Sequence, residues 1–374
     1  SGWSAAPPPP GSGGPPESPC LPDWERRGKP DGMGDQRKGP EMSGLERVGV
    51  IGAGAWGTAL AVTARRAGRA VTLWAREPDV VASVNGAHCN DLFLPGIPLD
   101  PAIQATGDQA ALAESDLLLL VTPAQHLRAG CRALAPYCRP GTPVVICSKG
   151  IEIASCALMH QVVVAELPQA VIAVLSGPTF AAEVARGLPT AITLACADPV
   201  LGAALVEALG TPSFRPYLSD DLAGAEIGGA VKNVLAIACG IVEGRGFGDN
   251  ARAALITRGL AEMTRLALGC GGRIETLMGL SGLGDLMLTA SSSQSRNYSL
   301  GFALGEGCTL DEILKGRHSV TEGVHSATAV VGMAEKHGIE MPICAAIDAV
   351  LNRGAALDTE IDNLLARPFR SEGV

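Results

Sequence analysis

Apolar and polar positions divide the chain from Arg47 onward into two regions of different periodicity. Up to about Leu218, short runs that are apolar throughout alternate with alanine-rich helical stretches such as Ala55–Ala67 and Leu201–Leu209. Continuous apolar runs of this length predict strands that are buried on both faces of a sheet. We expect such strands at Val48–Ile51, Ala70–Trp74, Leu117–Thr122, Val144–Cys147, Val171–Leu175 and Ala191–Cys196. The alternation predicts a doubly wound α/β sheet.

Beyond Leu218 the strand pattern fades and helical periodicity dominates from Ala223 to Leu365. The clearest apolar spacings of helical type lie at Ala251–Ala267, Val324–Lys336 and Ile343–Asn352. We therefore predict an α/β domain at residues 45–220 and an all-helical domain at residues 221–374.

Residues 1–44 differ in composition from the rest of the chain. Ten prolines and nine glycines stand among these 44 residues, including the run Pro7–Pro10. Such a segment buries too little apolar surface to offset its ordering entropy, so we predict a disordered tail. It has no apolar core of the kind found in secretory signals. A start at Met33 or Met42 would give a more ordinary protein, which leaves open whether residues 1–44 belong to the native chain.

Composition and charge narrow the classes of function. The formal net charge of -9 gives no general attraction to nucleic acid or to an anionic membrane, so an anionic substrate needs a local cluster of positive charge. The 11 cysteines contain no C-x-x-C pair and are expected to be free thiols in a reducing compartment. Apolar runs such as Leu117–Val121 are too short to span a bilayer, and the histidine spacing does not support a metal site.

The segment Gly52–Gly57 fits the pattern G-x-G-x-x-G, follows the first predicted strand and opens a predicted helix. In that context Gly52 permits the tight turn, Gly54 admits a pyrophosphate and Gly57 allows close helix–strand packing. The helix N-terminus supplies amide donors for the phosphates. The alternative is a simple tight turn, and the context favours dinucleotide binding.

The end of the second predicted strand bears on the choice of cofactor. An acidic residue there binds the ribose of NAD, but this chain places Arg76 before Glu77. A guanidinium suits the 2′-phosphate of NADP, whereas an ordinary surface arginine would leave Glu77 to bind the ribose. We expect NADP(H) or NAD(H), with a modest preference for NADP(H).

Lys232 lies in an otherwise apolar helical stretch, directly after the segment that contains Gly228 and Gly229. Burial disfavours a charged amine and lowers its pKa, which would suit Lys232 to proton transfer at a carbinol or ketone. The alternative is a lysine that extends to solvent along the helix surface. Paired glycines in a helix favour close approach of a backbone or a ligand.

Two further segments carry candidate chemistry. Lys149 follows a predicted strand at the carboxyl edge, where open α/β sheets bind ligands. Arg296 and Asn297, next to Ser295, form either a phosphate cradle or a solvated surface loop. Asp285 either orients Lys232 or caps the helix that begins near Leu286.

Together these segments resemble the bacterial NAD(P)-dependent sn-glycerol-3-phosphate dehydrogenases. The shared motifs are G-A-G-A-W-G-T-A-L-A, S-K-G-I-E, S-G-P-T-F-A-A-E-V-A, G-G-A-V-K-N, G-D-N-A-R-A-A-L-I-T-R-G-L and S-R-N, in the order of the family and over nearly all of residues 47–340. The resemblance implies a Rossmann-like domain, an all-α C-terminal domain with the helical architecture of 6-phosphogluconate dehydrogenase, and an active site between them.

The resemblance also implies roles for individual residues. Those with catalytic roles are Lys232 as the proton acceptor, with Lys149, Asn233, Asp285 and Thr289. Those that bind the cofactor are Gly52, Gly54, Ala55, Trp56, Gly57, Arg76, Lys149, Ala181, Arg296, Val320 and Glu322. Those that bind the substrate are Lys149, Gly177, Thr179, Lys232, Asp285, Ser295, Arg296 and Asn297. Thr179 stands where many members have serine, which preserves the hydroxyl.

The expected reaction is the reversible reduction of dihydroxyacetone phosphate to sn-glycerol 3-phosphate for glycerophospholipid synthesis. The resemblance further implies a cytoplasmic enzyme and a homodimer. Two alternatives stay open at this point. One is another β-hydroxyacid-type dehydrogenase, such as ketopantoate reductase or hydroxyisobutyrate dehydrogenase, and the other is a sensor that binds NADP(H) without turnover.

Overall fold

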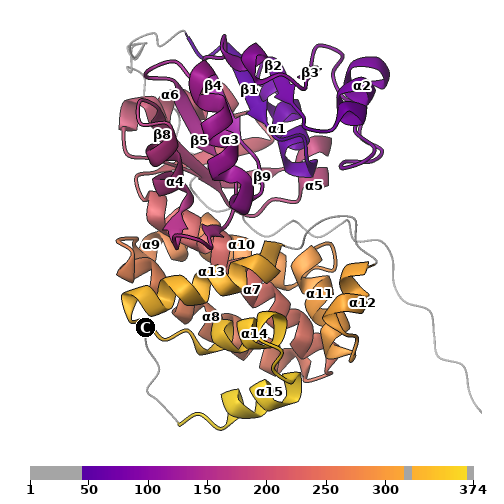
Figure 1. The fold of residues 1–374 in the computed structure, drawn as a ribbon, viewed down its shortest axis with the longest axis vertical. Coiled ribbons are helices and arrows are strands. Elements are labelled where there is room, and N and C mark those ends of the chain that lie inside the picture. The colour runs from indigo at the N-terminus through magenta and orange to yellow at the C-terminus, as the bar shows by residue number, and fades with distance from the viewer. Residues whose placement is uncertain (1–43, 316–321, 369–374) are drawn as a thin grey trace, which may run out of the picture. The chain divides into compact units, whose positions relative to one another are not determined.

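The computed structural model describes residues 44–315 and 322–368 (Figure 1). Its main sheet has eight strands in the order β10-β9-β8-β5-β4-β1-β2-β3. The strands are β1 Arg47–Ile51, β2 Ala70–Trp74, β3 Gln104–Thr106, β4 Leu117–Leu120, β5 Pro143–Ile146, β8 Val171–Ser176, β9 Thr190–Cys196 and β10 Phe214–Ser219. All neighbouring strands are parallel except β8 and β9, which pair antiparallel. The predicted α/β fold is therefore confirmed.

Helices cover both faces of this sheet, because successive apolar residues of each strand point to opposite sides. In β4, Leu117 and Leu119 join one core, whereas Leu118 and Leu120 join the other. The first core contains side chains from α1 Ala55–Arg66, α5 Ala181–Arg186 and α6 Pro199–Leu209, and the second contains side chains from α3 Leu127–Leu134 and α4 Met159–Glu166. The continuous apolar runs follow directly from this burial on both faces.

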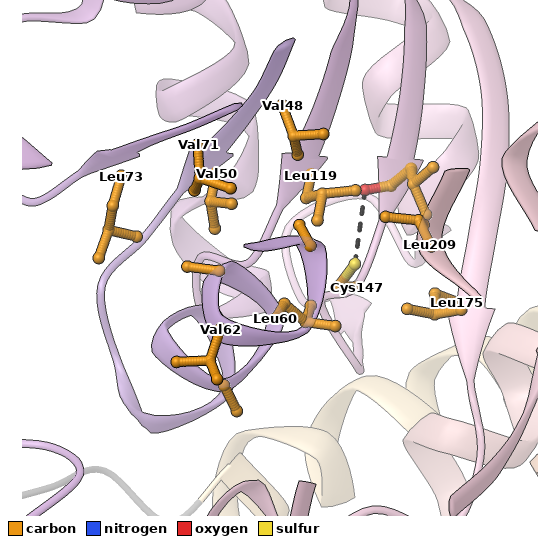
Figure 2. Close-up of a cluster of buried hydrophobic side chains, with 14 of the residues drawn as sticks. Val48, Val50, Leu60, Val62, Val71, Leu73, Leu119, Cys147, Leu175 and Leu209 are labelled. Atoms are coloured by element: carbon orange, nitrogen blue, oxygen red, sulfur yellow. Dashed lines mark hydrogen bonds between the residues drawn. The ribbon is translucent and has the colours of Figure 1, made fainter. Parts of the chain in front are cut away.

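Helix α1 packs against the sheet through a stripe of apolar residues. Figure 2 shows Leu60 and Val62 of α1 in the same cluster of buried side chains as Val50 and Leu119 of the sheet. Leu60 is 1% exposed. Truncating a leucine buried to this extent to alanine costs about 2–5 kcal/mol, so this contact holds the first turn of α1 beside the end of β1.

Two outer strands and one small hairpin were not predicted. β3 and β10 lie at the two edges of the sheet and carry polar or exposed residues, among them Gln104, Arg215 and Pro216. The hairpin of β6 Ile151–Glu152 and β7 Ala157–Leu158 has two residues in each strand. A further helix, α2 Pro78–Ala87, precedes β3, and short 3-10 turns lie at Gln109–Leu112, Ala124–His126 and Ala135–Tyr137.

After the last strand of the sheet, the described part of the chain forms helices and no further strand. They are α7 Leu222–Gly244, α8 Gly248–Gly269, α9 Ile274–Leu277, α10 Asp285–Ala290, α11 Arg296–Gly305, α12 Leu310–Lys315, α13 Glu322–His337, α14 Pro342–Asn352 and α15 Leu357–Leu365, with a π-helical turn η5 at Leu280–Gly284. Helix α7 is the centre of their shared core, which includes Ile227, Val231 and Leu235. The predicted helical part is confirmed.

Helix α7 differs from one expectation. With a mean hydropathy of 1.5 over its most apolar window, its 23 residues are long and apolar enough to cross a membrane, which the short apolar runs of the sequence do not predict. That window is entirely buried within the protein, and the helix also carries Glu226 and Lys232. Burial on all sides explains an apolar composition all round the helix.

Candidate active site

The glycine loop between β1 and α1 lies where the strand order reverses. Chain order runs from β1 through β2 to β3 on one side, and β4 then pairs with the other side of β1. The carboxyl ends of the strands at such a switch point form the crevice in which open α/β sheets bind dinucleotides. Gly52 has φ +112° and lies against the main chain of Val121 and Thr122, which follow β4.

The three glycines of this loop fit the roles that their spacing predicts. A Cβ on Gly57 would lie 1.8 Å from the carbonyl oxygen of Gly52, so only glycine fits there. A Cβ on Gly54 would meet nothing within 4 Å, which leaves the backbone open to a ligand. Gly54 is the N-cap of α1 without a side-chain cap, so the first-turn amides are available to phosphates. The residues present therefore fit a dinucleotide.

Arg76 lies at the end of β2, as predicted. Its side chain is 78% exposed and forms an ion pair with Glu77 at 2.8 Å. Ala55 and Trp56 are in the first turn of α1, and the indole Nε1 of Trp56 is buried without a hydrogen-bond partner. An unsatisfied buried donor beside the glycine loop fits a site whose ligand or water completes it.

Lys232 is buried in the middle of α7 and bonded to a carboxylate. Its Nζ donates to Asp285 Oδ1 at 2.5 Å and to Thr289 Oγ1 at 3.0 Å. Lys149, from the loop after β5, donates through Nζ to the other oxygen, Asp285 Oδ2, at 2.6 Å and to the carbonyl of Gly177 at 3.0 Å. Asp285, which is completely buried, therefore joins the two lysines.

This geometry changes the chemistry of Lys232. Burial lowers its pKa to about 8, attraction by Asp285 opposes that fall, and the charge of Lys149 adds to it. The amine can therefore accept and release a proton near neutral pH. Lys232 does not extend to solvent, since its side chain is only 8% exposed. Asp285 binds the lysines and is the first residue of α10, so the capping alternative is wrong.

Gly228 and Gly229 bring other segments close to α7. A Cβ on Gly228 would lie 2.3 Å from the carbonyl oxygen of Ser281, in η5. A Cβ on Gly229 would lie 2.8 Å from the hydroxyl of Ser176, at the end of β8. The paired glycines therefore allow close approach, as expected: the backbone of η5 lies against Gly228, and the end of β8 lies against Gly229.

The segment Ser295–Asn297 forms the first turn of α11. Ser295 is its N-cap, and its Oγ accepts the amide of Tyr298 at 3.2 Å. The Asn297 side chain donates through Nδ2 to Asn233 Oδ1 at 2.9 Å and accepts the amide of Gly323 at 3.0 Å. The side-chain amide of Asn233 in turn donates through Nδ2 to the carbonyl of Gly229 at 3.4 Å. Asn233 and Asn297 thus bind each other, and Ser295 caps the helix that carries Asn297.

The remaining predicted site residues that the structure describes lie around the same cluster. Thr179 Oγ1 donates to the carbonyl of Gly177 at 3.3 Å, and Ala181 opens α5, whose Glu183 faces Gln294 before α11 at 3.4 Å. Glu322 opens α13; burial raises the pKa of its carboxyl, and the charges of Arg296, Lys149 and Lys232 oppose that rise. Val320 lies outside the described residues.

One close side-chain pair between α4 and α7 involves no residue that the sequence singles out as a site residue. His160, in α4, and Glu226, in α7, form a close pair, with His160 Nδ1 2.6 Å from Glu226 Oε2. The sequence signal that indicates Lys232 is a charged residue in an otherwise apolar helix, and Glu226 has the same signal in the same helix. Within the described residues, no group of three or more histidine, cysteine, aspartate or glutamate side chains is placed to bind a metal.

Comparisons with known proteins agree with this arrangement. The family model described as NAD-dependent glycerol-3-phosphate dehydrogenase N-terminus matches residues 47–201, and that described as its C-terminus matches residues 221–362. Glycerol-3-phosphate dehydrogenase [NAD(P)+] of Parvibaculum lavamentivorans is 62% identical over 326 residues, which cover 87% of this chain and 98% of the relative. The enzyme of that name from Paramagnetospirillum magneticum is 77% identical over 255 residues, or 68% of this chain and 93% of the relative.

Solved structures give the same result at the level of the fold. The crystal structure of glycerol-3-phosphate dehydrogenase from Coxiella burnetii has a TM-score of 0.83 and 40% identity, with 86% of this chain and 99% of that chain covered. A ketopantoate reductase from Ralstonia eutropha has a TM-score of 0.57 and 18% identity over 84% of this chain and 99% of that chain, which shows a shared fold only. The chain belongs to the NAD-dependent glycerol-3-phosphate dehydrogenase family.

Proposed function

We propose that this protein reduces dihydroxyacetone phosphate to sn-glycerol 3-phosphate with NAD(P)H, in a reversible reaction. The observation that carries the proposal is the buried cluster in which Asp285 joins Lys232 and Lys149. This cluster places a lysine of lowered pKa next to the loops at the carboxyl edge of a dinucleotide-binding sheet. The two relatives named above are glycerol-3-phosphate dehydrogenases [NAD(P)+], which supports the same substrate and cofactor.

The glycine loop and the first turn of α1 would hold the pyrophosphate of the cofactor, and the bound nicotinamide supplies or takes up the hydride. Gly52, Gly54 and Gly57 leave the space for it, and Ala55 and Trp56 line the same turn. We assign further cofactor contacts to Lys149, Ala181, Arg296, Val320 and Glu322, as the family resemblance implies. Arg76 is exposed at the end of β2, where a guanidinium supports binding of a 2′-phosphate, and so a modest preference for NADP(H).

The phosphate of the substrate would bind at the start of α11. In this proposal the guanidinium of Arg296, the first residue of α11, would bind the phosphate, and Ser295 and Asn297 would fix the turn that carries it. Binding energy from this remote phosphate would hold the reacting carbonyl in place, which contributes to catalysis through orientation. Gly177 and Thr179 lie beside Lys149 and would contact the reacting end of the substrate.

Lys232 would move the proton of the reaction. In reduction its ammonium donates a proton to the C2 oxygen, and in oxidation its neutral amine takes the proton back. Lys149 would polarise the same oxygen with its positive charge, while Asp285 and Thr289 aim Lys232. Asn233, bonded to Asn297, would keep the substrate segment of α11 aligned with α7.

Family membership argues against both alternative functions. The chain matches the glycerol-3-phosphate dehydrogenase family along its length, whereas its likeness to ketopantoate reductases is one of fold. A sensor without turnover would have no need of the buried lysine cluster, which costs stability. We therefore propose a cytoplasmic enzyme that supplies glycerol 3-phosphate for glycerophospholipid synthesis. We also retain the division at residues 220 and 221, because β10 ends at Ser219 and α7 begins at Leu222.

We further propose that the enzyme is a homodimer. An apolar groove of about 1810 Å³ opens among α8, α14 and α15, with Leu255, Ile347 and Ile361 in its lining. None of the residues of α15 is buried, and Leu365 is 79% exposed. A groove of this size on a protein surface favours a partner, and a second copy of the same face would cover both α15 helices.

The experiment that tests the function follows absorbance at 340 nm with purified protein, dihydroxyacetone phosphate and either NADPH or NADH. We expect rapid oxidation of the nucleotide, faster with NADPH. Ketopantoate and hydroxyisobutyrate, with the appropriate form of the nucleotide, serve as comparison substrates and should give little activity. Folded protein that binds NADPH but turns over none of these substrates would instead support the sensor.

A further inference from the structure

Glu226 receives two hydrogen bonds from one residue of a different helix. The main-chain amide of His160 donates to Glu226 Oε1 at 2.7 Å, and Nδ1 of its ring lies 2.6 Å from Oε2. His160 is the second residue of α4, where a helix has free amides and a positive end of its dipole. The carboxylate of Glu226 therefore completes the N-terminus of α4 from the neighbouring helix α7.

Both side chains of the pair are largely buried, and the helix that carries His160 is held at its other end as well. The side chain of Glu226 is 1% exposed and that of His160 is 24% exposed. Helix α4 is itself fixed near its other end, where Glu166 binds Arg128 at 2.8 Å and Arg132 at 2.9 Å, both on α3. The pair thus attaches α7 to a helix that is already anchored on the sheet.

The hydrogen bond between Glu226 and His160 opposes the effect of burial on the pKa of each residue. Burial raises the pKa of Glu226, and the bond to His160 opposes that rise. Burial pulls the pKa of His160 down, but its bond to Glu226 and the attraction between them raise it above its ordinary value. Removing one partner of a buried, hydrogen-bonded pair leaves the other uncompensated, which weakens the attachment of the two helices.

Glu226 lies on α7 six residues before Lys232, a rise of about 9 Å along the helix. Gly229, between them, lies so close to Ser176 and Lys149 that a Cβ added to it would lie 2.8 Å from the Ser176 hydroxyl and 3.4 Å from Lys149 Cγ. A small rotation or shift of α7 at this point would therefore move the Lys232 amine relative to Lys149 and to the substrate. Misplacement by about 1 Å can cost about 100-fold in rate.

We propose that Glu226 and His160 are positioning residues for proton transfer, which fix α7 so that Lys232 is aligned with the substrate oxygen. The proposal rests on the function proposed above. Neither residue touches the reacting atoms; each acts through the helix that carries Lys232.

The test compares Glu226→Gln and His160→Gln with a matched control, Glu262→Gln. Glu262 is also a buried glutamate that completes a helix N-terminus, since it accepts the amides of Ile343 at 2.8 Å and Cys344 at 3.2 Å at the start of α14. Its helix, α8, does not carry the lysine. Each of the three variants weakens one buried contact between a carboxylate and the start of a helix.

Turnover is measured at saturating dihydroxyacetone phosphate and NADPH and is divided by the number of NADPH-binding sites found by fluorescence titration. This normalisation removes any loss of folded protein. We expect Glu226→Gln and His160→Gln to lower kcat per site by about 10-fold or more with unchanged Kd for NADPH, and Glu262→Gln to stay within about 2-fold of wild type. The double variant of Glu226 and His160 should be no slower than the slower single variant.

Three results would overturn the proposal: kcat within about 2-fold of wild type for Glu226→Gln, an equal loss for Glu262→Gln, or effects that multiply in the double variant. Should Glu226→Gln fail to fold, His160→Gln carries the same comparison, because it keeps the main-chain bond. Wild-type turnover is measured first, so an inactive wild type would refute the proposed function and not the positioning role.

Discussion

Burial lowers the pKa of Lys232 and the carboxylate of Asp285 opposes that fall, so Asp285→Asn should lower the pKa further. The substitution keeps the shape and one acceptor but removes the negative charge that both lysines share at 2.5 and 2.6 Å. A pair of charges 4 Å apart interacts by about 4 kcal/mol at an effective dielectric constant near 20. One pKa unit corresponds to about 1.4 kcal/mol, so the pKa of Lys232 should fall by about 2–3 units.

The sign of the effect follows from the role of the ammonium as proton donor in reduction. In the wild type the pKa of Lys232 is about 8, so kcat/KM for reduction should be level below that pH and fall above it. In Asp285→Asn the break should move to about pH 5–6. At pH 7.5 the protonated fraction would drop from about three quarters to about one hundredth, and kcat/KM with it.

The assay is the pH profile of kcat/KM for dihydroxyacetone phosphate at saturating NADPH, followed at 340 nm. Asp348→Asn is the control, because Asp348 is 1% exposed and ion-paired with Arg353 away from the lysines. It should leave the break near pH 8. A break that stays near pH 8 in Asp285→Asn, with only a lower plateau, would show that Asp285 orients Lys232 without setting its pKa.

Three other predictions concern the cofactor and the assembly. Gly57→Ala should abolish NADPH binding and destabilise the fold, because its Cβ would lie 1.8 Å from a carbonyl oxygen. Gly54→Ala should fold normally and lose only its affinity for NADPH. Thermal melting and fluorescence titration separate the two variants, and equal melting temperatures would refute the packing argument. Arg76→Ala should raise KM for NADPH by about 10-fold and leave KM for NADH unchanged, and equal effects on both would remove the 2′-phosphate role. Ile361→Arg should convert the dimer to a monomer in light scattering, and an unchanged dimer would place the interface elsewhere.

The sequence predicted the inner strands of the sheet because each is mostly apolar, as burial between helices on both faces requires. It did not predict β3 and β10, which lie at the edges, where only one side pairs and polar residues are tolerated. The hairpin β6–β7 is too short for any periodicity. Helix α7 resembles a membrane span in composition because it is surrounded by other helices, and composition alone does not distinguish these environments.

The candidate site could be predicted as a set of residues but not as a geometry. Lys232 and Asp285 are separated by 53 positions, and Lys149 and Asp285 by 136, so no local pattern shows that one carboxylate joins both lysines. The resemblance implies a catalytic role for Asn233 and a substrate-binding role for Asn297, but it gives no indication that the two side chains are bonded to each other. Such pairing depends on how distant helices pack, which periodicity does not specify.

The central claim is that Lys232 moves the proton in the reduction of dihydroxyacetone phosphate. The most direct test compares wild type with Lys232→Ala at 340 nm in NADPH and dihydroxyacetone phosphate, with the Kd for NADPH measured by fluorescence on the same preparations. We predict a kcat lower by about 10²–10⁴-fold with a nearly unchanged Kd. A variant with near-normal turnover would contradict the account and remove Lys232 from the mechanism.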